Sequence, residues 1–379
     1  MDMANLSFFC CSSSSNYFHV ILSATLLVLS TTMKIVGGIV QLPDGVVVPA
    51  VLAFGDSIVD TGNNNNLPTI AKANYPPYGQ NFMGGFPTGR FCNGKIPSDM
   101  IVNELGIKEV LPAYLDPKLQ PTELLTGVSF ASGGSGYDPL TAKLWIGTLD
   151  LSSQLNLFKE YIERVKAMVG EERTQSIISD SLYVLVAGSN DIANTYFDTP
   201  ARKFVYDVPA YTDLMLHHAK SFIQELYEIG ARRIAVTSAP PLGCLPAQRT
   251  LAGGKQRECA EEFNKASDLF NSKLSNALDQ FNKECKHLRA VYIDIFNPLL
   301  DLIKNPRSYG FEVSDRGCCG TGLIEAIFLC NMLNLFTCKD VTKYVFWDSY
   351  HPTEKAYRTL FIPILKSKAT SFYCGDRPC

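Results

Sequence analysis

Clustered charge, metal-binding cysteine pairs and long apolar runs are all scarce in this sequence. The formal net charge is -3, and Lys and Arg are spread along the 379 residues rather than grouped. This excludes the basic patch of a nucleic-acid-binding protein and the acidic tail of a protein with charged partners. No Cys-x-x-Cys pair occurs, which argues against a zinc site. We therefore expect a small, roughly neutral binding partner, no nucleic acid, no cofactor and no metal.

The N-terminal stretch has no Lys or Arg in its first 33 residues and a single short apolar run, Val20–Leu29. A membrane-spanning helix needs about 20 apolar residues, and no later stretch is both long and apolar enough, so we expect no stable membrane insertion. Small and hydroxyl residues follow the run. This pattern predicts that residues 1–38 are a secretory signal peptide, cleaved somewhere between Thr31 and Gly45.

The cysteines are concentrated near the C-terminus. Of the twelve, Cys10 and Cys11 lie in the leader and ten follow it, six of them after Gly317. An even number of cysteines in a secreted chain predicts disulfide bonds, although their pairing cannot be deduced from the sequence. We expect the last quarter of the chain to be cross-linked.

Apolar, β-branched runs alternate with helical patterns throughout residues 46–379. The expected strands are Val46–Phe54, Val128–Ala131, Leu182–Ala187, Arg233–Thr237 and Val291–Phe296, and the expected helices are Ser98–Leu105, Asp150–Val169, Tyr211–Ile229 and Glu258–Lys283. With 46% hydrophobic and 19% charged residues, and no repeat or linker, the chain can bury one large core. Strands alternating with helices of this length predict a single α/β domain whose parallel sheet is covered by helices on both faces.

Small and polar residues follow three of these strands. Ser57 comes directly after the first, Gly133 opens a glycine turn after the second, and Asn190 follows the third. Ligands of such sheets bind beyond the carboxyl ends of the strands. We therefore expect these residues to lie close together, and the loop that carries Asp348 and His351 could close over the same edge.

Asp348 and His351 form the pair around which the chemistry is predicted. Pro352 biases His351 toward an extended backbone just before a C-terminal helix. Asp348 can accept a hydrogen bond from Nδ1–H of His351 and leave Nε2 free to take a proton. Ser57 is then the predicted nucleophile, His351 the general base and Asp348 the residue that orients it.

Attack on an ester carbonyl creates an oxyanion, which needs hydrogen-bond donors already aimed at it. The candidates are the backbone N–H of Ser57, a backbone N–H of the glycine turn at Gly133 and the side-chain amide of Asn190. Gly134 or Gly136 could take the place of Gly133.

Each of these features alone has an ordinary structural explanation. Gly55-Asp56-Ser57 are common turn residues, Asn190 lies in a turn or N-cap, and the glycines could form a close-packed loop. Their joint occurrence at strand ends favours the catalytic interpretation, because the ordinary explanations do not predict it.

The order of the motifs along the chain carries a resemblance. The matching segments are Gly55–Asn65, Pro87–Gly94, Pro240–Cys244, Gly188–Asp191, Cys318–Gly322 and Phe346–Glu354. Together they resemble the plant GDSL esterase/lipase family of the SGNH hydrolase superfamily, and Ile96–Ile101 and Phe130–Pro139 are similar to its extracellular lipase branch. Ser129 and Cys92 stand where the family often has Asn and Ser, and the G-x-S-x-G elbow of α/β-hydrolases is absent around Ser57.

The resemblance implies a flavodoxin-like, three-layer α/β/α fold, the triad Ser57, His351 and Asp348, and an extracellular place in the cell wall, apoplast or pollen coat. We expect a secreted serine esterase or lipase that hydrolyses lipid-like or other acyl esters through an acyl-enzyme intermediate. The alternatives are an acyltransferase with the same triad and a non-catalytic extracellular binding or coat protein. The aromatic loop Tyr75–Phe91 suggests an apolar acyl or aromatic group, or else it forms its own packing core. The sequence does not determine the ester or the oligomeric state.

Overall fold

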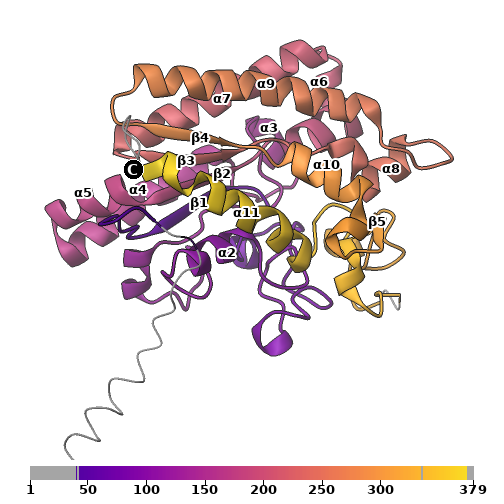
Figure 1. Ribbon diagram of the computed structural model, residues 1–379, viewed down its shortest axis with the longest axis horizontal. Helices are drawn as coiled ribbons and strands as arrows, with labels where there is room; N and C mark the ends of the chain where they lie inside the picture. Colours follow the sequence, from indigo (N-terminus) through magenta and orange to yellow (C-terminus); the bar gives the residue numbers. More distant parts are fainter. Residues whose placement is uncertain (1–39, 41, 334–335, 374–379) are drawn as a thin grey trace, which may run out of the picture. The chain divides into compact units, whose positions relative to one another are not determined.

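A four-stranded parallel sheet forms the centre of the protein (Figure 1). The computed structural model describes residue 40, residues 42–333 and residues 336–373, so the predicted signal peptide, residues 1–38, lies outside the described residues. The strands lie in the order β1 (Val51–Gly55), β2 (Leu182–Val186), β3 (Arg233–Thr237) and β4 (Arg289–Ile293). Every residue of β1 and β2 is buried, as expected for apolar strands that are covered on both faces.

The segment around Ser129 extends this sheet on the side of β1 that is remote from β2. Phe130 N–H donates to Ala53 O at 2.8 Å, Ser132 N–H donates to Gly55 O at 3.0 Å, and Ser129 pairs with Ala53 in parallel. The predicted strand is therefore in its expected place, although its pairing is a single bridge rather than a regular ladder. If the five strands are numbered by their order in the chain, the Ser129 segment is the second. Across the sheet they then lie in the order 2-1-3-4-5, which is the flavodoxin-like arrangement.

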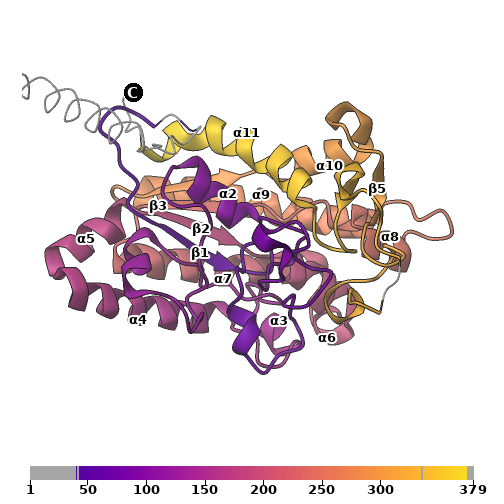
Figure 2. The same ribbon diagram turned by 90° about the horizontal axis from the view of Figure 1, so that it is seen from below.

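Helices cover both faces of the sheet (Figure 2). The helices α2 (Pro97–Glu104) and α11 (Glu354–Tyr373) lie on one face, and α4 (Leu151–Val169) and α7 (Val208–Ile229) lie on the other. The helix α9 (Glu261–Glu284) packs beside α7 and against β4, and α5 (Glu171–Asp180) follows α4. The three-layer α/β/α class is confirmed.

Most predicted boundaries agree with the structure to within a few residues, but the first strand begins at Val51 rather than at the predicted Val46. The helix α4 begins after Asp150, whose side chain accepts a hydrogen bond from Ser153 N–H and caps the helix. The prediction for β4 was wrong at its C-terminal end, because the strand stops at Ile293 and Phe296 already belongs to α10 (Phe296–Lys304). The sequence pattern also did not predict α5, which begins directly after the Gly170 that ends α4.

A second, two-stranded parallel sheet lies in the last quarter of the chain. It consists of β5 (Val313–Gly317) and β6 (Tyr344–Phe346). Disulfide bonds join Cys318 to Cys338 and Cys319 to Cys330 here, and a third joins Cys244 to Cys259. The predicted cross-linking of this quarter is confirmed. Among the described cysteines, Cys92 and Cys285 are free.

The remaining elements are short. They are the helices α3 (Pro139–Lys143), α6 (Pro200–Lys203) and α8 (Pro246–Ala252), a π-helix at Asp191–Asp198, and 3₁₀ turns at Asn63–Asn66, Met83–Gly85, Pro121–Thr126, Leu242–Cys244, Pro306–Tyr309, Ile327–Leu329 and Val341–Lys343. Within the described ranges, no helix combines the length and the apolar character that crossing a membrane requires.

Candidate active site

Ser57 lies two residues beyond the end of β1. This is the switch point of the sheet, because the Ser129 segment lies on one side of β1 and β2 on the other. Gly55, the last residue of β1, has a φ of +124°, and a Cβ placed on it would lie 1.8 Å from Val186 O of the neighbouring strand. Only glycine fits this close approach. The side chain of Gln154 in α4 accepts a hydrogen bond from Gly55 N–H at 2.8 Å and donates one to Gly55 O at 2.9 Å. Gln154 could not be predicted from the sequence, because a glutamine within a helix gives no local signal.

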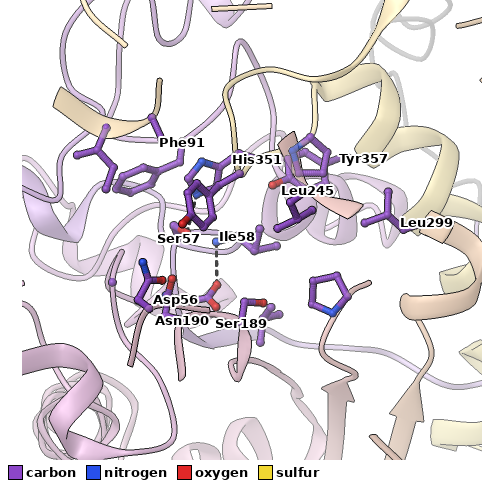
Figure 3. Close-up of a pocket in the computed structure, with 18 of the residues that line it drawn as sticks. Asp56, Ser57, Ile58, Phe91, Ser189, Asn190, Leu245, Leu299, His351 and Tyr357 are labelled. Carbon is purple, nitrogen blue, oxygen red and sulfur yellow. Dashed lines mark hydrogen bonds between the residues drawn. The ribbon is translucent and has the colours of Figure 1, made fainter. Parts of the chain in front are cut away.

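His351 and Asp348 form a continuous hydrogen-bonded chain with Ser57. The distance from Ser57 Oγ to His351 Nε2 is 2.8 Å, and that from His351 Nδ1 to Asp348 Oδ2 is also 2.8 Å. Exposure is 9% for Ser57, 6% for His351 and 0% for Asp348. Figure 3 shows Ser57 between the imidazole of His351 and the side chains of Asp56 and Asn190. The structure therefore brings together the three residues that the sequence singled out.

The loop that carries His351 is tightly closed. Trp347 N–H donates to His351 O at 2.7 Å, and Thr353 Oγ1 accepts from Ala356 N–H at 3.2 Å in the first turn of α11. His351 thus lies in a loop just before the C-terminal helix, as its neighbour Pro352 suggested. Asp348 Oδ1 accepts hydrogen bonds from the backbone N–H groups of Tyr350 and His351, which sets the direction of the carboxylate.

The aromatic loop Tyr75–Phe91 contributes one ring to the cavity wall and others to a packing cluster. Phe91 lines the cavity beside Ser57, and the centroid of its ring lies 5.3 Å from the centroid of the His351 ring. Tyr78 and Phe91 also pack with Trp347 in a small buried cluster apart from the main core. Cys92, next in the chain, is a buried thiol whose Sγ contacts Pro352 O at 3.5 Å, and burial raises its pKa.

The contacts of the glycine turn distinguish between its candidate donors. Gly133 N–H donates to Asp60 Oδ2 at 2.9 Å, and Gly133 O accepts from Asn64 Nδ2 at 2.9 Å. Gly134 lines the cavity, and its N–H has no hydrogen-bond partner among the described residues. The C=O and N–H of a trans peptide point in opposite directions, so the Gly134 N–H points away from Asn64. These contacts favour Gly134 over Gly133 as the oxyanion donor.

Asn190 lies on the cavity wall with one amide hydrogen already engaged. Its Nδ2 donates to Ser135 O at 2.8 Å, which leaves the second N–H for a ligand. Asp191 accepts hydrogen bonds from the N–H groups of Tyr137 and Asp138 and from the hydroxyl of Thr141. The Asp191 carboxylate thereby joins the glycine turn to the π-helix that follows Asn190. Such π-helical turns are frequent at functional sites.

Three carboxyl groups are buried beneath the site. Burial raises the pKa of Asp56 to about 7, and its Oδ2 has no hydrogen-bond partner among the described residues. Burial also raises the pKa values of Asp60 and Asp191 to about 6, although each accepts several hydrogen bonds. A partly protonated Asp56 places less negative charge below Ser57, which favours the formation of an anion there.

A cavity of about 250 Å³ opens beside Ser57 and is lined mainly by apolar side chains. Its apolar wall includes Ile58, Leu245, Leu299, Ile324, Ile327, Phe328, Leu360 and Phe361. Its polar groups, among them Ser57, Asn190 and His351, are few, which is typical of a pocket that binds an apolar molecule and fixes one polar group of it. The described residues contain no group of three His, Cys, Asp or Glu side chains that could hold a metal ion.

A flavodoxin-like sheet with Ser, His and Asp in contact at its carboxyl edge has the architecture of an SGNH-type hydrolase. Comparison with known proteins agrees: the GDSL-like Lipase/Acylhydrolase family matches residues 51–364. The sequence is 52% identical over 370 residues to GDSL esterase/lipase EXL3 of Arabidopsis thaliana, covering 98% of this chain and 100% of the relative. It is 52% identical over 342 residues to GDSL esterase/lipase At5g42170 of the same organism, covering 90% and 92%. Identity to GDSL esterase/lipase EXL2, also from Arabidopsis thaliana, is 50% over 362 residues, covering 92% and 94%.

The chain belongs to the GDSL esterase/lipase family, and its enzyme class is that of carboxylic ester hydrolases.

Proposed function

We propose that this protein is a secreted serine esterase that cleaves acyl esters through an acyl-enzyme intermediate. The observation that carries the proposal is the unbroken chain from Ser57 Oγ through His351 to Asp348, with 2.8 Å at each step. These are the distances at which a base takes a proton from a hydroxyl group. A purely structural histidine would not need the nucleophile on one ring nitrogen and a carboxylate on the other.

In this mechanism His351 takes the proton of Ser57 while Oγ attacks the ester carbonyl carbon. The resulting oxyanion accepts hydrogen bonds from the N–H groups of Ser57 and Gly134 and from the amide of Asn190. His351 then gives its proton to the leaving alcohol, and Ser57 retains the acyl group. In deacylation His351 deprotonates a water molecule that attacks the acyl-enzyme, and its proton returns to Ser57.

The test of the proposal is hydrolysis of a p-nitrophenyl ester by the purified protein and by Ser57→Ala. We expect the wild type to turn over and Ser57→Ala to lose about 10⁴-fold or more in kcat. A fluorophosphonate probe should label the wild type at Ser57. Retained hydrolysis by pure, folded Ser57→Ala would refute the proposal.

The surface next to the cavity favours lipid-like esters as substrates. Phe328 lines the cavity and is 51% exposed. The same stretch of the chain continues into Met332, Leu333 and Phe336, which are 69%, 87% and 73% exposed. Residues 326–338 contain no charged side chain. An apolar cavity with an apolar margin fits a long acyl chain better than an acetylated sugar.

A chain-length series of p-nitrophenyl esters tests this substrate class. We expect kcat/KM to rise from acetyl to medium and long acyl groups, and Phe328→Ser, in the cavity wall, to weaken turnover of the long esters only. Val47→Ser is the matched control, because Val47 is 76% exposed but precedes β1 at the opposite end of the sheet. A preference for acetyl esters, or equal effects of the two variants, would contradict the assignment.

Secretion is supported by the three disulfide bonds, because such bonds persist in oxidising compartments. Expression of the full chain in plant cells should deliver a shortened protein to the extracellular fluid. N-terminal sequencing of that protein should place its first residue between Thr31 and Gly45. Full-length protein retained inside the cell would contradict secretion.

Acyl transfer is a second candidate function, and the apolar lining of the cavity is the observation that favours it. A pocket that excludes water extends the lifetime of an acyl-enzyme and allows an alcohol to accept the acyl group. Product analysis with a long-chain alcohol decides between the two functions. Transesterified product in excess of free acid would support the transferase.

A further inference from the structure

Tyr78 connects two parts of the site that are far apart in the sequence. Its Oη lies 2.7 Å from Asp348 Oδ2 and 2.8 Å from the backbone nitrogen of Ile327. Both distances are those of well-formed hydrogen bonds. Because Tyr78 is only 1% exposed, bulk water does not compete for either contact.

The direction of both hydrogen bonds follows from the chemistry of the groups. A backbone N–H can only donate, so Tyr78 Oη accepts from Ile327, and its single proton is donated to the Asp348 carboxylate. Burial, together with the Asp348 charge, raises the pKa of Tyr78, so the phenol keeps this proton. The accepting oxygen, Asp348 Oδ2, is also the one that lies 2.8 Å from His351 Nδ1.

Ile327 has a backbone conformation that needs support. Its φ is +52°, in the left-handed region that β-branched residues rarely adopt. Such a conformation persists only where the surrounding structure holds it. The hydrogen bond to Tyr78 Oη is one such restraint, and the disulfide between Cys319 and Cys330 encloses the same loop. Ile327 lines the cavity, so its position determines the shape of the apolar wall.

We propose that Tyr78 is a positioning residue whose one hydroxyl holds both the Asp348 carboxylate and the cavity wall at Ile327. The inference rests on the proposed function of Ser57, His351 and Asp348. Through Asp348, Tyr78 acts on the orientation of the general base. Through Ile327, it acts on the binding of the acyl chain. The two effects belong to different kinetic parameters and can be measured separately.

The variant Tyr78→Phe removes Oη and keeps the ring that packs against Phe91 and Trp347. We expect kcat to fall about tenfold for acetyl and long-chain esters alike, the usual effect of losing a hydrogen bond to a charged group. We expect KM to rise several-fold for long-chain esters and little for acetyl esters, because a long acyl chain buries more apolar surface against the cavity wall than an acetyl group does.

Tyr75→Phe is the matched control. Tyr75 lies three residues away in the same loop, and its ring contacts that of Tyr78 at 5.9 Å. Its hydroxyl, however, donates a hydrogen bond to the backbone carbonyl of Lys72 at 3.0 Å, whereas Asp348 and Ile327 are hydrogen-bonded to Tyr78. We expect Tyr75→Phe to keep the kcat and KM of the wild type for both classes of ester.

A spectroscopic readout separates positioning from a general loss of structure. We expect the proton between His351 Nδ1 and Asp348 to give a downfield NMR resonance. Tyr78→Phe should shift this resonance in samples that circular dichroism shows to be fully folded before urea is added. If Tyr78→Phe does not fold, 3-fluorotyrosine at position 78 retains the hydroxyl as a more acidic donor and should move the resonance in the opposite direction.

An unchanged resonance together with wild-type kcat in Tyr78→Phe would overturn the inference, as would a loss of kcat that only mirrors a loss of folded protein. The proposed function fails on a different result, retained hydrolysis by Ser57→Ala. The two failures are therefore distinguishable.

Discussion

The two sides of the candidate site are built in different ways. On the nucleophile side, Ser57 and Asn190 follow β1 and β2, whose residues are buried in the main hydrophobic core. On the base side, Asp348 and His351 follow β6 of the small second sheet, next to a separate cluster that contains Tyr78, Phe91 and Trp347. Two disulfide bonds, between Cys318 and Cys338 and between Cys319 and Cys330, cross-link this second region.

This difference indicates how each side keeps its geometry. The nucleophile is placed by close backbone packing between strands, which we expect to open only when the central sheet unfolds. The base is placed by a loop that lies beside two cross-links and is held by hydrogen bonds, so we expect its region to open before the central sheet does. Perturbing the strand contact on the first side should affect the whole fold, and perturbing the cross-links on the second should affect activity before it affects the sheet.

The largest effect is expected from Gly55→Ala, because its Cβ would overlap Val186 O at 1.8 Å. We expect a loss of at least about 4 kcal/mol in the free energy of unfolding, measured by urea denaturation. Gly254→Ala is the control: it has a φ of +66° but no atom within 4 Å of the added Cβ, and should cost only about 1 kcal/mol. Similar losses in both variants would show that the contact between β1 and β2 is not what restricts Gly55.

Asn190→Ala tests the nucleophile side without disturbing the sheet. We expect kcat to fall by about 10² to 10³, the usual effect of removing one oxyanion donor, with little change in the urea midpoint. Asn282→Ala is the matched control. It also removes a hydrogen bond from a side-chain amide to a backbone carbonyl, here that of Ala290, but this bond lies at the start of β4. Its kcat should be that of the wild type. Comparable kcat values for the two variants would exclude Asn190 from the oxyanion site.

On the base side, the double variant Cys319→Ser, Cys330→Ser opens a loop with a sequence separation of 11. We expect it to destabilise this region by about 3 kcal/mol. In a urea titration, activity should disappear before the central sheet unfolds, as followed by far-UV circular dichroism. In the control variant Cys244→Ser, Cys259→Ser, activity and dichroism should be lost together, because that disulfide bond joins elements of the main core. If activity and dichroism were lost at the same urea concentration in both variants, the two sides of the site would not differ in local stability.

The smallest effect concerns the pH dependence of Asp56, whose pKa is raised by burial to about 7. The folded state then binds a proton that the unfolded state has already released, so this group lowers stability as the pH rises from about 4 to about 7. Asp56→Asn removes that dependence. Measured by urea unfolding, the variant should gain of the order of 2 kcal/mol relative to the wild type between pH 5 and pH 8. A difference that is independent of pH would contradict a raised pKa.

Local patterns in the sequence predicted much of this protein correctly. The strand at Arg233–Thr237 agrees at both ends, and α4 agrees to one residue because Asp150 and Gly170 are strong signals for helix ends. The three residues Ser57, His351 and Asp348 lie in hydrogen-bond contact, as expected for the ends of parallel strands and a closing loop. Their catalytic roles, and that of Asn190, stay predictions until the variants are measured.

The sequence alone determined the element order, the fold class and the kinds of side chain available for chemistry, because these depend on residues that are neighbours in the chain. The tertiary structure decided which cysteines pair, that the Gly133 N–H is bonded to Asp60, and that the side chains of Gln154 and Tyr78 are bonded to Gly55 and Asp348. The physical reason is that hydrogen-bond partners are set by packing. Tyr78 and Asp348 are separated by 270 residues, and no local pattern records that their side chains meet.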